Sequence, residues 1–173
     1  MEDKQEISYL NHTNQMEQND ICCPVLDLEH WDDKLHEWSE KGFLSETVYT
    51  CYYVPLNFRW VIRRLDKILE NSEATVPHYL CLSEPLSPWK MMIYLAVDRK
   101  LEEKNYIELN GMFYSRVFDG PYKHIPKWWK QLHEIVKSKG FQTKRQFIWY
   151  TTCPKCAKKR GNNYVVLFAS LND

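Results

Sequence analysis

Short apolar runs along the chain predict strands, and two longer patterns with helical spacing predict helices. The clearest pair of strands covers 147–152 and 163–169, where nearly every residue is apolar, β-branched or aromatic. The loop between them opens with Cys153-Pro154-Lys155-Cys156 and closes with Gly161-Asn162-Asn163, residues that accept the positive φ of a tight reversal. We therefore expect a β-hairpin with a cysteine knuckle at its tip, covered on one face by helices and on the other by a second layer or a ligand.

The first half of the chain predicts a strand, a helix and two further strands. Residues 46–54 are β-branched and aromatic and stop at Pro55, as a strand does. Asn57 is a suitable N-cap for a helix over 57–69, in which apolar residues follow the 3.6-residue period. Two extended runs follow at 78–83 and 89–97, joined by a proline-containing loop.

The second half repeats this order of elements. A strand is predicted over 111–119, then a Gly120-Pro121 turn, a helix that begins near Pro126 and stops at Gly140, and two strands. Equivalent elements of the two halves lie at a nearly constant offset, which grows only where the knuckle is inserted. We therefore predict an α+β fold made of duplicated β-α-β-β repeats, with an antiparallel sheet, helices on one face and a ligand cleft at the repeat junction.

The domain boundaries follow from the same pattern. Residues 1–20 are polar and aperiodic, which predicts disorder. Residues 21–45 are expected to form an N-terminal arm that wraps the domain, with Trp31, Leu35 and Trp38 at the spacing of a short helical turn. One domain is expected over 46–173, with its repeats at about 46–98 and 110–171.

Composition narrows the class of protein. A chain of 173 residues can bury a core of its own, and its 23 basic and 23 acidic side chains give no overall field for a polyanion, so nucleic acid is not a favoured partner. Neither a secretory h-region nor an apolar run close to the roughly 18 residues of a membrane span is found. We expect a cytoplasmic protein with no membrane partner.

The stretch Val117-Phe118-Asp119-Gly120-Pro121-Tyr122 and the order of elements over about 46–170 resemble the GyrI-like small-molecule-binding domains. Such domains also serve as effector domains of AraC-type and MerR-type multidrug regulators. The resemblance implies two β-α-β-β repeats and an aromatic cleft for hydrophobic, often cationic compounds. It also implies a hydrolytic branch that opens cyclopropane-bearing natural products. Ile148 stands where the family tends to place an acid, which removes the expected partner of a cationic ligand.

The cysteines are the first group with candidate chemistry. The Cys-Cys-Pro arm at Cys22 and Cys23 and the knuckle at Cys153 and Cys156 resemble a stand-alone bacterial subgroup loosely labelled hydrolase. The knuckle has the spacing of half a zinc site, and the arm can supply the other two thiols for structural zinc, the one cofactor that these motifs suggest. A redox pair and a reduced, inert knuckle stay open. A thioredoxin-type pair is disfavoured because that motif begins a helix, whereas a hairpin is expected here.

The predicted cleft supplies the second group. Aromatic and polar residues of the strands near the repeat junction are candidate ligand-binding residues: Trp89, Tyr94, Tyr114, Arg116, Trp149 and Tyr150. Glu84 and Asp119 are the acids best placed for catalysis, because a carboxylate beside aromatic rings has its pKa raised by desolvation and can act as a general acid or base. The alternative for Asp119 is a cap on the following turn.

Three functions are consistent with these features. The first is a stand-alone protein that senses or sequesters an aromatic or apolar small molecule in the inter-repeat cleft. The second is a hydrolase that uses Asp119 or Glu84 to activate water against a strained or electrophilic small molecule. The third is an interaction module that contacts a protein or an anionic surface through the basic tip at 155–160.

Overall fold

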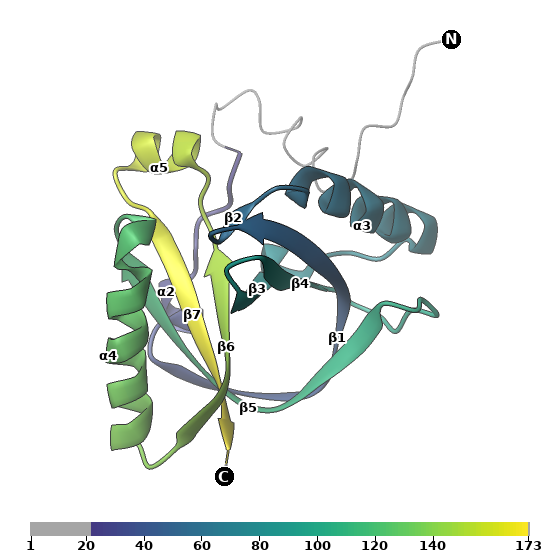
Figure 1. Cartoon of the computed structure of the whole chain (residues 1–173). Helices are drawn as coiled ribbons and strands as arrows, with labels where there is room; N and C mark the ends of the chain where they lie inside the picture. The colour runs from purple at the N-terminus through teal and green to yellow at the C-terminus, as the bar shows by residue number, and fades with distance from the viewer. Residues whose placement is uncertain (1–21, 173) are drawn as a thin grey trace.

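The computed structural model describes residues 22–172, so the predicted disorder of 1–20 lies outside the described residues. Seven antiparallel strands form one sheet, and six of them close into a barrel in the order β1-β4-β3-β6-β7-β5, because β5 pairs back onto β1 (Figure 1). The elements are α2 (Leu28–Trp31), β1 (Lys34–Cys51), β2 (Val54–Pro55), α3 (Phe58–Ser72), the 3-10 turn η2 (Pro77–Tyr79), β3 (Cys81–Ser87), β4 (Lys90–Ala96), β5 (Tyr106–Asp119), the 3-10 turn η3 (Tyr122–His124), α4 (Ile125–Ser138), β6 (Gln142–Tyr150), α5 (Pro154–Arg160) and β7 (Tyr164–Asn172).

The predicted antiparallel α+β architecture is present, and the order β-α-β-β occurs twice, as β1-α3-β3-β4 and β5-α4-β6-β7. Within the first set β4 lies between β1 and β3, and within the second set β7 lies between β5 and β6. The two sets meet at the β1–β5 and β3–β6 pairings. This order agrees with the repeats expected from the sequence, while their origin by duplication and the cleft between them stay predictions.

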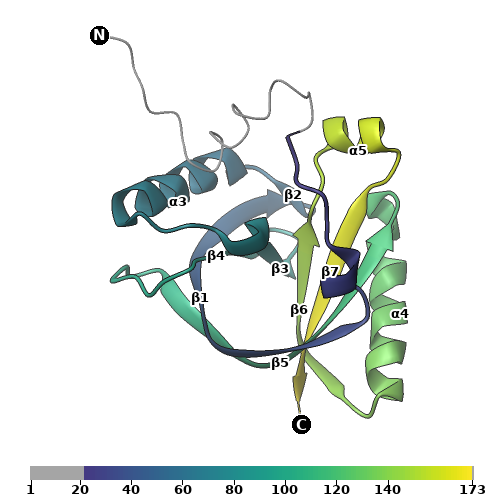
Figure 2. The ribbon, with the colours of Figure 1, turned by 180° about the vertical axis from the view of Figure 1, so that it is seen from behind.

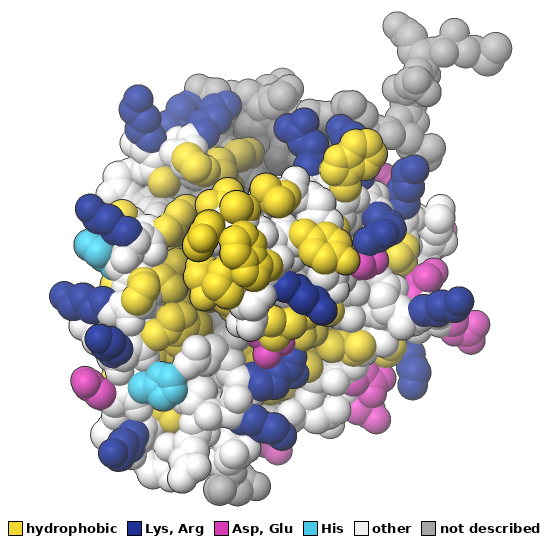
Figure 3. Space-filling model, viewed as in Figure 1, with side chains coloured by type: hydrophobic (Ala, Val, Ile, Leu, Met, Phe, Trp, Pro, Cys, Tyr) yellow, Lys and Arg dark blue, Asp and Glu magenta, His cyan; other side chains and the backbone are white. Residues whose placement is uncertain are grey.

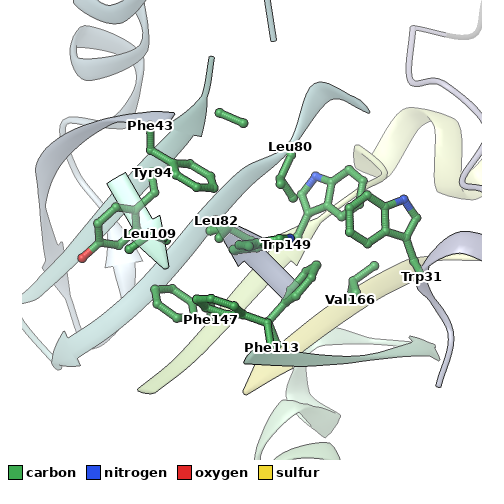
Figure 4. Packing of buried hydrophobic residues seen from close by; sticks show 13 residues of the cluster. Trp31, Phe43, Leu80, Leu82, Tyr94, Leu109, Phe113, Phe147, Trp149 and Val166 are labelled. Atoms are coloured by element: carbon green, nitrogen blue, oxygen red, sulfur yellow. The ribbon is translucent and has the colours of Figure 1, made fainter. Parts of the chain in front are cut away.

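Side chains of β6 and β7 point alternately into the barrel and toward α4, which explains why nearly every residue of these two strands is apolar. Val166 and Phe168 of β7 point into the barrel, whereas Val165 and Leu167 pack beneath α4. Figure 4 shows the interior, where aromatic side chains from different strands meet, including Phe113, Phe147 and Trp149. The hairpin predicted at 147–169 is the β6–β7 pair, covered on both faces as expected, and the second layer is the barrel interior itself.

Both long helices pack on the outer surface of the barrel. The apolar side of α3 rests on β1 and β4 through Val61, Leu65 and Leu69, and α4 covers β6 and β7 through Leu132 and Val136. Figures 1 and 2 show the two helices on different sides of the barrel. The sequence predicted helices on one face of the sheet. Because the sheet is closed, that face is the outer surface of the barrel.

The predicted start of the first strand at residue 46 is wrong, because β1 begins at Lys34. Its first part pairs with β5 and its second part with β4, and the register shifts between Trp38 and Lys41, where Glu40 has φ +50°. This first part is polar except for Leu35 and Trp38, so its alternation is weak in the sequence. Half of the expected arm therefore belongs to the barrel.

Candidate functional site

Four cysteines from the two ends of the described chain come together at α5. Cys22 and Cys23 precede α2, while Cys153 and Cys156 belong to the segment between β6 and β7. The Sγ atom of Cys22 lies 3.4 Å from those of Cys153 and Cys156, and all four sulfurs lie within 4.8 Å of one another. Disulfide sulfurs are about 2.05 Å apart, so these thiols are unbridged.

Local structure holds this cluster in place. Cys153 is the N-cap of α5, Pro154 follows at the first helical position, and Gly161 ends the helix with φ +74°. Backbone N–H groups point at the sulfurs: the N–H of Cys22 donates to Cys156 Sγ at 3.2 Å, and that of Cys153 donates to Cys23 Sγ at 3.2 Å. Arg160 donates to the carbonyl oxygens of Cys23 and Pro24, which binds the arm to the other end of α5.

The electrostatics of the four thiols are unequal. Burial raises the pKa of Cys22 to about 11 and also raises the pKa of Cys23. Burial acts in the same direction on Cys156, but hydrogen bonds from Cys22, Cys23 and Cys153 outweigh it and lower the pKa of Cys156 to about 6. Four sulfur donors converging from two segments match the closed, tetrahedral ligand set of a structural zinc centre.

The structure corrects one argument about the knuckle. Cys153-Pro154-Lys155-Cys156 follows strand β6 and begins helix α5, so the argument that a hairpin tip disfavours a thioredoxin-type pair is wrong. What distinguishes this motif from an isolated redox pair is the presence of Cys22 and Cys23 in the same cluster. Two further thiolate donors favour a metal over a two-cysteine redox cycle.

A second polar cluster lies inside one end of the barrel. Glu84 of β3 accepts hydrogen bonds from Arg145 of β6 at 2.9 and 2.7 Å and from the Tyr94 hydroxyl at 2.7 Å. Arg145 also donates to the Tyr94 oxygen at 2.7 Å. The side chain of Glu84 is 12% exposed and that of Arg145 is 35% exposed, so solvent reaches part of the Arg145 side chain.

This cluster overturns the predicted electrostatics of Glu84. Burial raises its pKa, but the hydrogen bonds from Arg145 and Tyr94 prevail, and the pKa of Glu84 is lowered. Sequence reasoning missed Arg145, although its alternation with Phe147 and Trp149 on the inward side of β6 was a usable signal. The ion pair also joins β3 to β6, whose backbone register consists of the single pair Ser83↔Ile148.

Asp119 is not part of that cluster. Its Oδ1 accepts the backbone N–H of Asn163 at 2.7 Å, which links the end of β5 to the start of β7. This contact reaches Asn163 and not the turn that follows Asp119, so a cap on that turn stays a prediction. The two candidate catalytic acids thus have different partners and lie on different strands.

The six predicted ligand-binding residues are distributed over several surfaces. Tyr94 and Trp149 lie inside the barrel, each 5% exposed, where Tyr94 packs on Phe147 and Trp149 packs on Trp31. Side chains of the barrel itself therefore cover both rings. A ligand would have to displace some of these side chains to reach them.

The other four predicted residues point outward. Tyr114 is buried among the residues beneath α4 and donates to Asp33, and Arg116 pairs with Asp32 at 3.5 Å. Tyr150 packs on Tyr122, and Trp89 is exposed in the turn between β3 and β4. Described residues also line a polar pocket of about 230 Å³, formed by Glu40, Gly42, Val97, Asp98, Arg99, Lys100, Tyr106 and Glu108, which includes none of the predicted site residues.

One serine–histidine contact was not predicted. His36 Nε2 lies 2.7 Å from Ser115 Oγ, but that hydroxyl is fully buried and donates to the carbonyl oxygen of Trp31 at 2.6 Å. Burial lowers the pKa of His36 to about 4, so the imidazole is neutral near pH 7. A serine whose proton is given to a carbonyl inside the core is not placed for nucleophilic attack, so this contact is structural.

Fold and site together define a small antiparallel barrel protein with a four-cysteine candidate metal centre. The chain belongs to the bacterial hydrolase family, whose model matches residues 13–171. This agrees with the hydrolase label expected from the cysteine motifs, while the GyrI-like resemblance stays a prediction. No curated protein matches the chain. Among residues 22–172, no helix is long and apolar enough to cross a membrane.

Proposed function

We propose that Cys22, Cys23, Cys153 and Cys156 bind one structural zinc ion. The observation that carries this proposal is the placement of four sulfur atoms within 4.8 Å of one another. Zinc takes four such donors in closed sites and stabilises a fold without entering a reaction. The N–H groups directed at the sulfurs favour the thiolate form that a metal requires.

The metal content of the purified protein tests this proposal. Protein prepared under reducing conditions is expected to carry one zinc per chain by elemental analysis, and Cys22→Ser and Cys156→Ser are expected to lose it. Cys81→Ser is the matched control, because Cys81 packs beneath α3 among apolar residues. Zinc-free protein with all four thiols titratable would contradict the proposal, and a visible absorption band would indicate iron in the same site.

For the reaction, we propose that the chain hydrolyses an electrophilic small molecule at the end of the barrel where Glu84, Tyr94 and Arg145 meet. The family match supports hydrolysis, and the ionised carboxylate beside the partly exposed side chain of Arg145 supports this location. Glu84 Oε1 accepts one hydrogen bond from Arg145, which leaves a lone pair for a water molecule.

The roles of the three side chains follow from their contacts. Glu84 takes a proton from the water that attacks the electrophilic carbon, the bond to the leaving group breaks, and Glu84 then passes the proton to the departing group. The outward N–H donors of Arg145 stabilise the negative charge that develops on the substrate. The Tyr94 pKa is raised by burial and by Glu84, so its hydroxyl stays protonated and holds the carboxylate in place.

Chromogenic esters provide the test, because their hydrolysis releases a coloured alcohol whatever the natural substrate is. Glu84→Gln is expected to lower kcat by two to four orders of magnitude, roughly the contribution of a general base, with little change in binding. Asp119→Asn is the control and should retain activity. Unchanged turnover in Glu84→Gln, with its fold verified by circular dichroism, would reject this location.

We propose as the second candidate that the barrel sequesters an apolar compound among its interior aromatic rings. The single β3–β6 residue pair supports it, because that seam is the least costly place to part the strands and admit a ligand. An organic mass retained in native mass spectrometry, and released without chemical change, is expected in this case. Protein that turns over esters but retains no compound would favour the hydrolase instead.

A further inference from the structure

Six consecutive residues at the end of β1 are exposed and uncharged. The run Cys51-Tyr52-Tyr53-Val54-Pro55-Leu56 covers the β1–β2 turn, and Tyr52 and Leu56 keep 72% and 68% of their surface accessible. Monomeric proteins rarely place so many apolar residues together in solvent without a binding role. Neither the proposed metal centre nor the hydrolytic site uses this run.

The backbone of this turn is strained by its own aromatic residues. Cys51 pairs with Val54, so Tyr52 and Tyr53 are the two central residues of a hairpin turn, with φ values of +47° and +70°. Such turns favour Asn-Gly, because bulky residues resist positive φ. Tyrosines here cost stability and gain little packing, which indicates that their exposed rings serve another purpose.

The turn continues into a larger aromatic surface. Tyr52 packs on Trp89 with ring centroids 4.8 Å apart, and backbone hydrogen bonds join Thr50 to Trp89 and Tyr53 to Pro88. We call Tyr49, Tyr52, Tyr53, Val54, Leu56 and Trp89 the aromatic tip. Figure 3 shows hydrophobic side chains gathered in the upper middle of one face of the molecule, with Lys and Arg and a few Asp and Glu side chains near them.

The sequence segments that form the aromatic tip carry charges of one sign. Between Glu46 and Asp66 the chain has three arginines and no acid, and between Glu84 and Asp98 it has Lys90 and no acid. Arg64 pairs with Glu46, whereas exposed Arg59, Arg63 and Lys90 form no ion pair with residues 22–172. A chain of zero net charge thus presents a local cationic surface around apolar side chains.

We propose that the aromatic tip docks on an anionic lipid bilayer. Tyr and Trp favour the headgroup level of a membrane, where the ring is buried and its polar atom stays hydrated, and nearby cations contact anionic headgroups. The aliphatic Val54 and Leu56 suit burial among lipid rather than stacking on bases. Two copies meeting through this surface would bring like charges together. Docking on the surface of a bilayer differs from spanning it. The proposal departs from the expectation, drawn from the sequence, that the protein has no membrane partner.

Co-sedimentation of the full chain with vesicles tests the proposal. Binding is expected to vesicles of phosphatidylcholine with phosphatidylglycerol and to be weak with phosphatidylcholine alone. The double variant Tyr52→Asn/Tyr53→Gly and the double variant Arg59→Glu/Arg63→Glu are each expected to lower the partition coefficient by about tenfold or more. Lys127→Glu/Lys130→Glu on α4 is the charge-matched control and should bind as the wild type does.

The Asn-Gly variant separates docking from folding. It relaxes the strained turn, so its melting temperature is expected to equal or exceed that of the wild type while vesicle binding is lost. Absence of binding, equal binding to both vesicle types, or full binding by either tip variant would overturn the proposal. Loss in these variants of self-association or of oligothymidylate binding, without any vesicle binding, would equally overturn it in favour of a dimer or a nucleic-acid surface.

Discussion

Asp66 is a buried acid, and no residue among 22–172 donates a hydrogen bond to either of its carboxylate oxygens. It lies on the inward side of α3, near apolar residues that hold the helix on the barrel. Burial raises its pKa to about 7, and Glu70 one turn away acts in the same direction. The folded state therefore binds this proton more tightly than the unfolded state does. Its contribution to stability is full below the unfolded pKa of about 3.9 and is lost as pH rises through 7.

Replacing Asp66 by asparagine removes the charge and keeps the shape. At pH 8 the free energy of unfolding of Asp66→Asn is expected to exceed that of the wild type by about 2 kcal/mol, after allowance for solvent screening. Near pH 4 the two proteins should be equally stable, because Asp66 is then protonated. Thermal unfolding across this pH range measures the difference, and a difference independent of pH would contradict the assignment.

Individual residues show which contacts of the candidate site could be predicted from the sequence and which could not. The four cysteines were found together because thiols are few and their spacing is specific. Tyr94, one partner of Glu84, was predicted in the same site, whereas Arg145 was missed, because it follows Glu84 by 61 positions and its alternation along β6 does not say which residue it pairs with. The contact of Asp119 was missed for the same reason, since Asn163 follows it by 44 positions.

At the scale of elements, the local sequence pattern was sufficient to predict a helix or strand wherever that element packs against another. The helical period of α3 and α4 and the two-sided apolar strands β6 and β7 predicted their type and their coverage. Boundaries were less well predicted where polarity hides alternation, as in the first part of β1. The knuckle was expected to be a plain turn, but Pro154 at the first helical position and Gly161 at the end were sufficient for a short helix.

Barrel closure is a property of the whole molecule that the sequence did not disclose. It depends on β1 pairing with both β4 and β5, and a strand shared between two partners looks like any other strand in one dimension. Closure decides which face of each strand is inside. Tyr94 and Trp149 consequently face the interior while Tyr114 faces α4, so residues expected in one cleft are separated by the sheet.

The proposed metal centre would also affect the whole molecule, because the four-cysteine cluster anchors the segment that leads to Trp31. That indole packs inside the barrel on Trp149 and Phe168, and the cysteines hold the segment only a few residues before it. Removal of the metal with a strong chelator is expected to lower the melting temperature by several degrees and to expose residues 22–31 to protease. Mass spectrometry of the cleaved fragments locates the cuts.

A variant that lacks one of the four cysteines distinguishes release of the N-terminal arm from unfolding of the whole barrel. The Cys156→Ser variant should already be cut at residues 22–31 without chelator, and further chelator should not change its pattern. Cleavage spread evenly through β3 and β4 would show that the ion supports the entire barrel rather than the arm. Identical resistance with and without metal would show that Arg160 alone is sufficient to retain the arm.

A ring of strands has little free edge. Among the described strands β2 lies at the margin of the sheet, is two residues long, and contains Pro55, which has no N–H to donate. At this margin an extended peptide, or a second copy of the chain, therefore finds almost no backbone groups to pair with. The β2 margin is thus a poor template for fibril growth, and a partner that recognises this margin must read side chains rather than main chain.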